Sequence, residues 1–164
     1  MKAAIFLSVI MLAFVQQPTL TITSPAFTAN GAIPAKYTCQ GAEVSPALNV
    51  NGIPAGSKSL VIIVHDPDAP HPGGVTHWVV WNIPVTNFIA ENYKGGVQGK
   101  NTMKVNGYKG MCPPDGMHHY NFKVYALDAM LSSDSNMDQA GLEKAMQGHI
   151  VAQGVLTGTY EKSK

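Results

Sequence analysis

Histidines and carboxylates gather in two short windows of this sequence, where they could do acid–base chemistry, bind a metal ion or hold an anion. Five of the six histidines lie in the stretches 64–78 and 110–122. The first stretch runs from Asp66 through a proline-rich loop to His77, and the second runs through a proline- and glycine-rich turn to His118. Incidental histidines would be spread more evenly along the chain. The two windows therefore predict one polar site.

Three buried strands must position these side chains. Residues 60–66 are apolar on both alternations, which predicts a central strand buried on two faces. The stretches 77–83 and 119–127 predict two more strong strands. Because alternate side chains of a strand point to opposite faces, His118 and Tyr120 should both point inward. We expect the strand ends to form a pocket lined by Asp66, His77, His118 and Tyr120.

Strand alternation also predicts the face on which Asp66 and His77 lie. It groups Asp66 with the Val64 face of its strand, and His77 with the face that carries Val79 and Trp81. An alternative is that His77 and His118 are core histidines, satisfied by Asp66 or by the backbone. The other four histidines are assigned to the surface or to packing: His65, His71, His119 and His149.

The composition limits the class of protein. The chain has 164 residues, of which 45% are hydrophobic, so it can bury a sizeable core and is not disordered. Only 13% are charged, the formal net charge is +1 and arginine is absent, which argues against a nucleic-acid binder. Sixteen glycines and eleven prolines favour short strands and many turns. One helix is predicted, from Met137 to Gln147, with Asn136 or Ser135 as its N-cap.

The N-terminal segment and the two cysteines bear on the compartment. Lys2 precedes an uncharged run up to Val15, which is too short to span a membrane and fits a secretory signal peptide over residues 1–17. Residues 18–164 then form one domain, in a periplasmic or secreted protein. An N-terminal core strand or an uncleaved anchor is the alternative. In an oxidising compartment Cys39 and Cys112 would pair, although a nucleophilic Cys112 or a metal site with His118 and His119 stays open.

Three kinds of function remain compatible with the two windows. The first is a binding protein that holds an anion. The second is a hydrolase, but no Gly-x-Ser-x-Gly turn is present, and Ser45 or a reduced Cys112 are the only nearby nucleophiles. The third is a metal site formed by His77, His118 and a carboxylate.

The two windows resemble the signature segments of a known family. Asp-Pro-Asp-Ala-Pro at 66–70 followed by His-Trp at 77–78, and the run 107–122, are similar to those of the phosphatidylethanolamine-binding proteins. The likeness is to their bacterial, Raf-kinase-inhibitor-like branch. It extends from Leu20 to Tyr160 and includes Ser-Pro-Ala-Leu at 45–48.

The resemblance implies both a fold and a function. The fold is mainly β, an antiparallel β-sandwich with one or two short helices near the C-terminus. The function is that of a non-enzymatic binding protein without metal or cofactor, whose pocket takes phosphate or phosphorylated head groups. A kinase or protease partner of such an inhibitor-like regulator is unidentified. The implied ligand residues are Asp66, Pro70, His77, Gly110, Pro114, His118 and Tyr120.

One electrostatic expectation follows for an anion pocket without arginine. The Asp66 carboxylate is a poor neighbour for phosphate unless it accepts a hydrogen bond from His77 or His118. A nearby carboxylate favours the imidazolium form. We therefore expect one of these two histidines to supply the positive charge.

Overall fold

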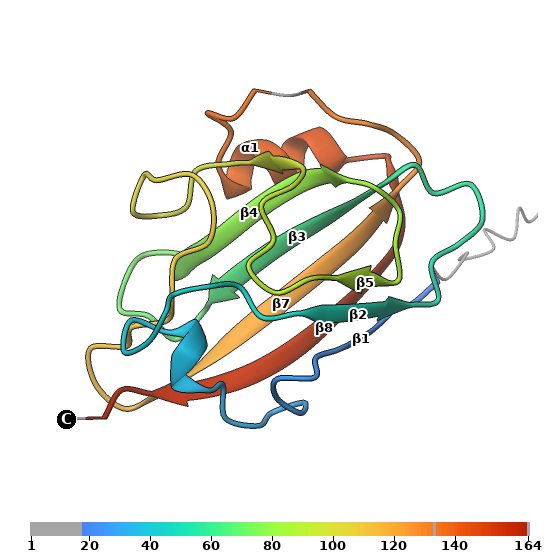
Figure 1. The fold of residues 1–164 in the computed structure, drawn as a ribbon. Coiled ribbons are helices and arrows are strands. Elements are labelled where there is room, and N and C mark those ends of the chain that lie inside the picture. Colours follow the sequence, from blue (N-terminus) through green and yellow to red (C-terminus); the bar gives the residue numbers. More distant parts are fainter. Residues whose placement is uncertain (1–17, 133, 164) are drawn as a thin grey trace, which may run out of the picture.

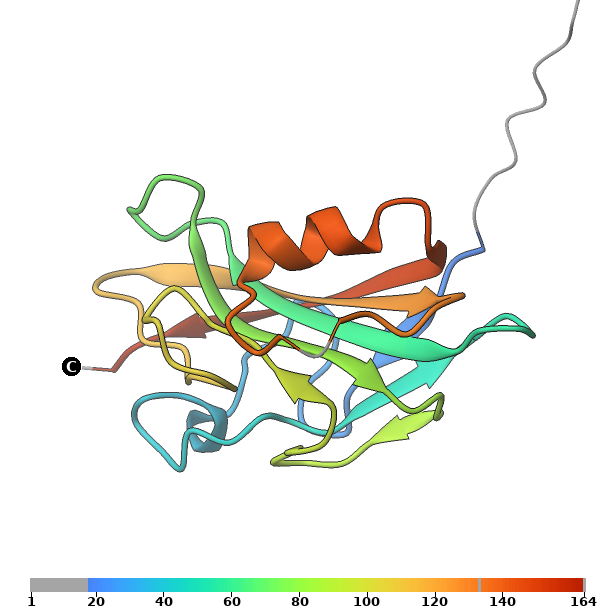
Figure 2. The same cartoon turned by 90° about the horizontal axis from the view of Figure 1, so that it is seen from above.

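Two antiparallel sheets and one helix form three layers in the computed structural model, which describes residues 18–132 and 134–163. The larger sheet has five strands in the order β6-β4-β3-β7-β8, and the smaller has three in the order β1-β2-β5. Figure 1 and Figure 2 show the small sheet against one face of the large sheet and the helix α1 against the other. The predicted antiparallel β-sandwich with a short helix near the C-terminus is confirmed.

The elements largely follow the apolar runs of the sequence. The strands of the large sheet are β3 Ser59–Asp66, β4 Val75–Ile83, β6 Val97–Gln98, β7 Met117–Leu127 and β8 Ile150–Glu161. The other elements are β1 Thr21–Thr23, β2 Leu48–Asn51, β5 Phe88–Ile89, the 3₁₀ helix η1 Ala35–Tyr37 and α1 Gln139–Met146. The strands expected around 60–66, 77–83 and 119–127 are thus present as β3, β4 and β7.

Strand β3 occupies the middle of the large sheet because both of its faces are apolar. It pairs with β4 on one side and with β7 on the other, and all of its residues except His65 are buried. Ile62 and Val64 belong to the core beneath the small sheet, whereas Val61 and Ile63 pack with the apolar residues of α1. The core therefore holds β3 fixed, and with it the polar residue at its end.

The helix begins later than the sequence predicted. α1 starts at Gln139, and its N-cap is Asp138, whose carboxylate accepts the Gly141 N–H at 3.1 Å. Asn136 and Ser135 were the wrong caps, because Met137 packs against the core cluster under α1 instead of starting the helix. Ser135, Asn136 and Asp138 all have side chains that can cap a helix, so side-chain type alone did not identify the N-cap.

The predicted signal peptide, residues 1–17, lies outside the described residues and stays a prediction. Within the part of the chain that the structure describes, no helix is long and apolar enough to cross a membrane.

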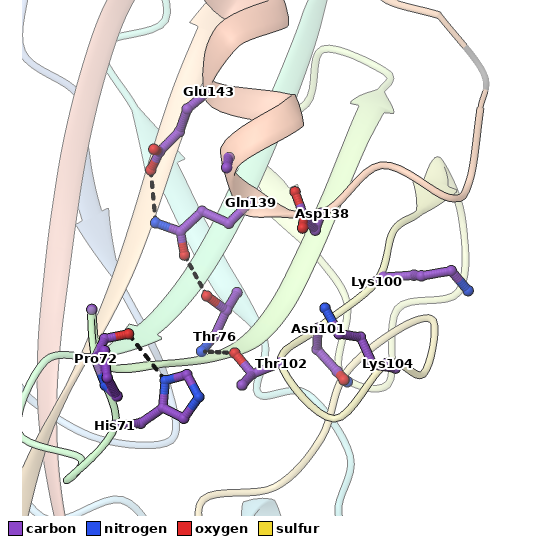
Figure 3. A pocket seen from close by; sticks show the side chains of 13 residues that line it. His71, Pro72, Thr76, Lys100, Asn101, Thr102, Lys104, Asp138, Gln139 and Glu143 are labelled. Carbon is purple, nitrogen blue, oxygen red and sulfur yellow. Dashed lines mark hydrogen bonds between the residues drawn. The ribbon is translucent and has the colours of Figure 1, made fainter.

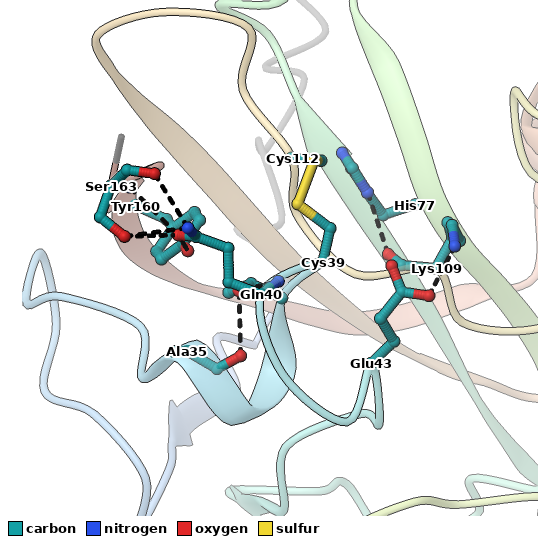
Figure 4. Close-up of a disulfide and its surroundings, with 10 residues drawn as sticks. Ala35, Cys39, Gln40, Glu43, His77, Lys109, Cys112, Tyr160 and Ser163 are labelled. Carbon is teal, nitrogen blue, oxygen red and sulfur yellow. Dashed lines mark hydrogen bonds and ion pairs between the residues drawn. A yellow bond between two sulfur atoms is a disulfide. The ribbon is translucent and has the colours of Figure 1, made fainter.

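A disulfide between Cys39 and Cys112 ties the segment after η1 to the segment that leads into β7. The two Cα atoms lie 5.4 Å apart, and the bridge spans 73 residues of sequence. The backbone reinforces the connection, since the Cys39 N–H donates to the Met111 carbonyl at 3.0 Å. Figure 4 shows the bridge beside His77 and Lys109, so the cross-link lies at the end of the sandwich where the sequence places the site.

Replacing both cysteines, as in C39S/C112S, should lower the free energy of unfolding by about 4 kcal/mol, because the cross-link restricts the unfolded chain over a long loop. Urea denaturation followed by tryptophan fluorescence measures the loss. A reductant should destabilise the wild type by the same amount and leave the double variant unchanged. Equal stability of the wild type with and without reductant would contradict the stabilising role.

Candidate ligand-binding site

A cavity of about 390 Å³ lies where the end of β3, the start of β4 and the start of β7 meet. The loop after β3 and the segment before β7 complete its walls. Every ligand residue that the resemblance implied lines this cavity except Tyr120, which is fully buried. The lining residues are Asp66, Ala69, Pro70, His71, Val75, His77, Met103, Lys109, Gly110, Cys112, Pro113, Pro114 and His118.

Asp66 ends β3 and is only 2% exposed, yet both of its carboxylate oxygens are satisfied. Oδ1 accepts the N–H groups of Asp68 at 2.9 Å and Ala69 at 3.1 Å, which turns the chain out of the strand. Oδ2 accepts the His118 Nδ1–H at 2.8 Å. Of the two expected donors to Asp66, the structure thus selects His118. The carboxylate joins β3 and β7 at the cavity.

His77 reaches the cavity through a β-bulge. Val64 pairs with Trp78 but His65 pairs with Thr76, so His77 is the extra residue of β4. The His77 ring meets Tyr120 edge-on, with centroids 5.4 Å apart, on the side of the sheet that faces the small sheet. The alternation that grouped His77 with Val79 and Trp81 was therefore wrong, because the bulge interrupts the period of two.

The Lys109 backbone fixes the orientation of the His77 ring. The Nδ1 atom lies 3.0 Å from the Lys109 carbonyl, and the Lys109 N–H donates to the His77 carbonyl at 2.9 Å. A carbonyl oxygen can only accept, so Nδ1 carries the proton. Burial lowers the pKa of His77, although the Lys109 carbonyl and the Asp66 charge act in the opposite direction. Of the two histidines that could supply the expected positive charge, His77 is therefore not the one, because desolvation outweighs its neighbours.

Two glycines let the backbone approach closely around the cavity. A Cβ atom on Gly110 would lie 2.7 Å from the Thr38 carbonyl carbon and 3.0 Å from the Cys39 nitrogen. Gly74, with φ +76°, would place its Cβ 2.3 Å from the Asp66 carbonyl oxygen. These are backbone contacts that cannot move aside easily. Glycine is thus required where the wall meets the disulfide segment and where the loop returns to β4.

Tyr120 is buried, and its ring packs against the rings of His77 and His118. Its ring centroid is 5.4 Å from that of His77 and 6.4 Å from that of His118. Burial, followed by the nearby Asp66 charge, raises the pKa of the Tyr120 hydroxyl. This hydroxyl has no hydrogen-bond partner among the described residues. A buried unpaired hydroxyl is costly, and a bound oxygen atom or an ordered water is the usual way to satisfy it.

Several lining residues were not predicted from the sequence. Lys109 acts through its backbone carbonyl, which leaves no side-chain signature, although it lies directly before the predicted Gly110. Its ammonium group is paired with Glu43. His71, assigned to the surface or to packing, lines the cavity within the first histidine window, and Met103 and Cys112 contribute wall.

The remaining histidines form exposed contacts. His119 holds Asp68 with both its N–H, at 2.8 Å, and its ring Nδ1, at 2.7 Å. This pair lies next to the buried pair in sequence but is open to solvent. His149 pairs with Asp128 in the same exposed manner. Within residues 18–132 and 134–163, no cluster of three or more histidine, cysteine or acidic side chains is arranged to hold a metal ion.

A second hollow, of about 320 Å³, lies beside the start of α1 (Figure 3). Its polar groups satisfy one another: the Thr76 hydroxyl donates to Gln139, and Gln139 donates to Glu143 at 2.7 Å. The acidic Asp138 and Glu143 also face it. Neither His77 nor His118 lines this hollow. The cavity at the strand ends is therefore the candidate site.

The fold and the cavity place this protein among the antiparallel β-sandwiches that have a pocket lined by aspartate and histidine at the strand ends. Residues 23–161 match the family model described as phosphatidylethanolamine-binding protein. The chain therefore belongs to the phosphatidylethanolamine-binding protein family, as the resemblance implied.

Relatives and solved structures agree with this assignment. A UPF0098 protein of Pyrococcus horikoshii is 47% identical over 85% of this chain and 75% of its own length. A solved phosphatidylethanolamine-binding protein homologue from Chlamydia trachomatis is 44% identical, covers 88% of this chain and 99% of its own, and superimposes with a TM-score of 0.84. The relatives include archaeal as well as bacterial proteins, so the branch that the sequence resembles is not confined to bacteria.

Two further structures show how far the likeness reaches. YbcL of Escherichia coli, described as a member of the mammalian family, is 31% identical over 90% of this chain and all of its own, with a TM-score of 0.81. A carboxypeptidase Y inhibitor, solved with its cognate proteinase, is 18% identical over 90% of this chain and 84% of its own, with a TM-score of 0.51. The inhibitor shares the fold alone.

Replacing Asp66 by alanine should lower the free energy of unfolding at pH 7 by about 3 kcal/mol, because two backbone N–H groups and a buried imidazole lose their acceptor. The matched variant D68A breaks the exposed pair with His119 and should cost less than about 1 kcal/mol. Urea unfolding, followed by the fluorescence of the buried Trp78 and Trp81, measures both. Equal losses would show that burial does not distinguish the two pairs.

The lowered pKa of His77 makes stability depend on pH in a defined direction. Below about pH 6.5 the unfolded chain binds a proton at this histidine that the folded chain resists, so stability should fall as the pH falls through this range. The variant H77Q removes this contribution, so its stability difference from the wild type should change between pH 7.5 and pH 5.5. The exposed H149Q serves as the control. Identical pH profiles for the wild type and H77Q would contradict a buried, neutral His77.

Proposed function

We propose that this protein binds a small oxyanion, phosphate or a phosphorylated group, in the cavity at the strand ends. The observation that carries the proposal is the orientation of two imidazoles on one cavity. The Nδ1 atoms of His77 and His118 are both held by protein acceptors, at 3.0 Å and 2.8 Å. Each ring therefore has Nε2 left for a ligand, in a geometry fixed before binding.

The size and lining of the cavity support a small ligand. A volume of about 390 Å³ lies at the low end for ligand pockets. The prolines of both loops give stiff, largely apolar walls, with few polar groups to orient an occupant. Lys109 is the only lysine among the lining residues, and its side chain is 43% exposed. It can reach an anion at the rim.

We further propose that the cavity binds without turnover. Its lining contains no serine or threonine, and its cysteine is committed to the disulfide. The hydrolase interpretation therefore has no nucleophile beside the histidines. A regulated kinase or protease partner stays a prediction, because the carboxypeptidase Y inhibitor shares only the fold with this chain.

Titration with inorganic phosphate at pH 6, followed by amide NMR, tests the site. The shifts should concentrate in residues 66–77 and 109–118. The variant K109M should weaken binding by about five- to tenfold, whereas K36M, which breaks the similarly exposed ion pair with Glu91, should not change it. Phosphate shifts that lie elsewhere, or no binding at all, would refute the proposal. In a parallel titration methyl phosphate should remain intact by phosphorus NMR, and its hydrolysis would overturn binding without turnover.

A further inference from the structure

Three asparagine–glycine pairs occur in the sequence: Asn30-Gly31, Asn51-Gly52 and Asn106-Gly107. An asparagine before glycine can lose its side-chain amide, because glycine has no side chain to hinder its backbone nitrogen from attacking the amide carbon. The reaction is fastest where the asparagine side chain is free and the glycine N–H is not held by an acceptor. The fold decides which of the three pairs meets both conditions.

The structure holds both reacting groups of Asn106-Gly107. The Asn106 side-chain amide donates to the Gln98 and Ser135 carbonyls, each at 2.8 Å. The Gly107 N–H donates to the Gly99 carbonyl at 3.2 Å. Ring closure at this pair would have to break these hydrogen bonds first, so it requires a local opening of the structure.

The pair Asn30-Gly31 is held through its backbone. The Asn30 N–H donates to the Thr157 carbonyl at 2.7 Å, and the Gly31 N–H donates to the Thr28 carbonyl at 2.9 Å. The Gly31 carbonyl accepts the Thr159 N–H at 2.9 Å. The attacking nitrogen is therefore engaged, and the segment is fixed against the edge of β8.

The pair Asn51-Gly52 meets both conditions. Asn51 is the last residue of β2, and both residues are exposed. Among the described residues, neither the Asn51 side chain nor the Gly52 N–H has a hydrogen-bond partner. Gly52, with φ +82°, leaves the strand and begins the connection to β3. Figure 1 shows that β2 ends on the side of the sandwich where β3 begins, away from the ligand cavity at the end of β3.

We propose that Asn51 deamidates in the folded protein, whereas Asn30 and Asn106 are protected by their surroundings. The Gly52 N–H loses its proton to hydroxide, and the nitrogen forms a bond to Cγ of Asn51. The Cγ–Nδ2 bond then breaks, and Nδ2 leaves as ammonia after it takes a proton from water. Water opens the resulting succinimide ring at either carbonyl, which gives aspartate or isoaspartate at position 51.

The isoaspartate product disturbs the start of β1. Asn51 pairs with Thr21, which is the first residue of this three-residue strand. Isoaspartate continues the main chain through its side-chain carbon and so adds one methylene to the backbone. The groups that pair with Thr21 are thereby displaced from register. Aspartate keeps the backbone unchanged and adds only an exposed charge.

Peptide mapping by mass spectrometry after incubation at pH 8 tests the site. In the native protein Asn51 should deamidate at least about tenfold faster than Asn30 or Asn106. In urea with the disulfide reduced, where no fold protects any pair, the three rates should agree within about threefold. The variant N51Q, whose longer side chain closes the ring far more slowly, should keep its mass during the native incubation. No reaction at Asn51, or equal rates at the three pairs in the native protein, would overturn the proposal.

Amide hydrogen exchange tests the consequence for β1. Aged wild-type protein, enriched in isoaspartate, should exchange faster than fresh protein over residues 19–23. The variant N51D carries the charge without the extra methylene and should exchange like the fresh wild type. Unchanged exchange in the aged protein would refute the effect on β1. Both measurements are made without ligand, so they are independent of the proposed phosphate binding.

Discussion

The buried carboxylate of Asp66 organises the candidate site, because its oxygens must be satisfied away from water. One oxygen captures two amide groups of the loop after β3, and the other captures the ring of His118 on β7. The direction of the loop, the tautomer of His118 and the spacing of two strands are thereby set by one side chain. The central position of β3 is what keeps that side chain buried.

The second organising constraint is the bulge that brings His77 to the same cavity. On a regular strand this ring would face α1, where Val79 and Trp81 lie. The extra residue turns it toward Tyr120, and the Lys109 carbonyl then fixes its tautomer. Because the disulfide and Gly110 hold the Lys109 segment against the Cys39 segment, the proton on His77 depends on residues far away in sequence.

The sequence predicted the strands well and the site partly. Apolar runs on both alternations identified β3 and β4, and the period of two correctly turned His118 and Tyr120 inward. The bulge at His77 could not be predicted, because it depends on how β3 and β4 pair rather than on a local preference. The role of the Lys109 carbonyl was equally hidden, since every residue carries one. The cap of α1 was misplaced because packing of Met137 decided between several competent polar residues.

The protonation state of His77 is the most direct test of how this site works. Long-range ¹H–¹⁵N NMR of the imidazole rings at pH 7 reports which ring nitrogen carries the proton. A neutral His77 ring with its proton on Nδ1 and a lone pair on Nε2 is the expected result. An imidazolium at pH 7, or a proton on Nε2, would contradict a buried, neutral His77 whose ring is oriented by the Lys109 carbonyl.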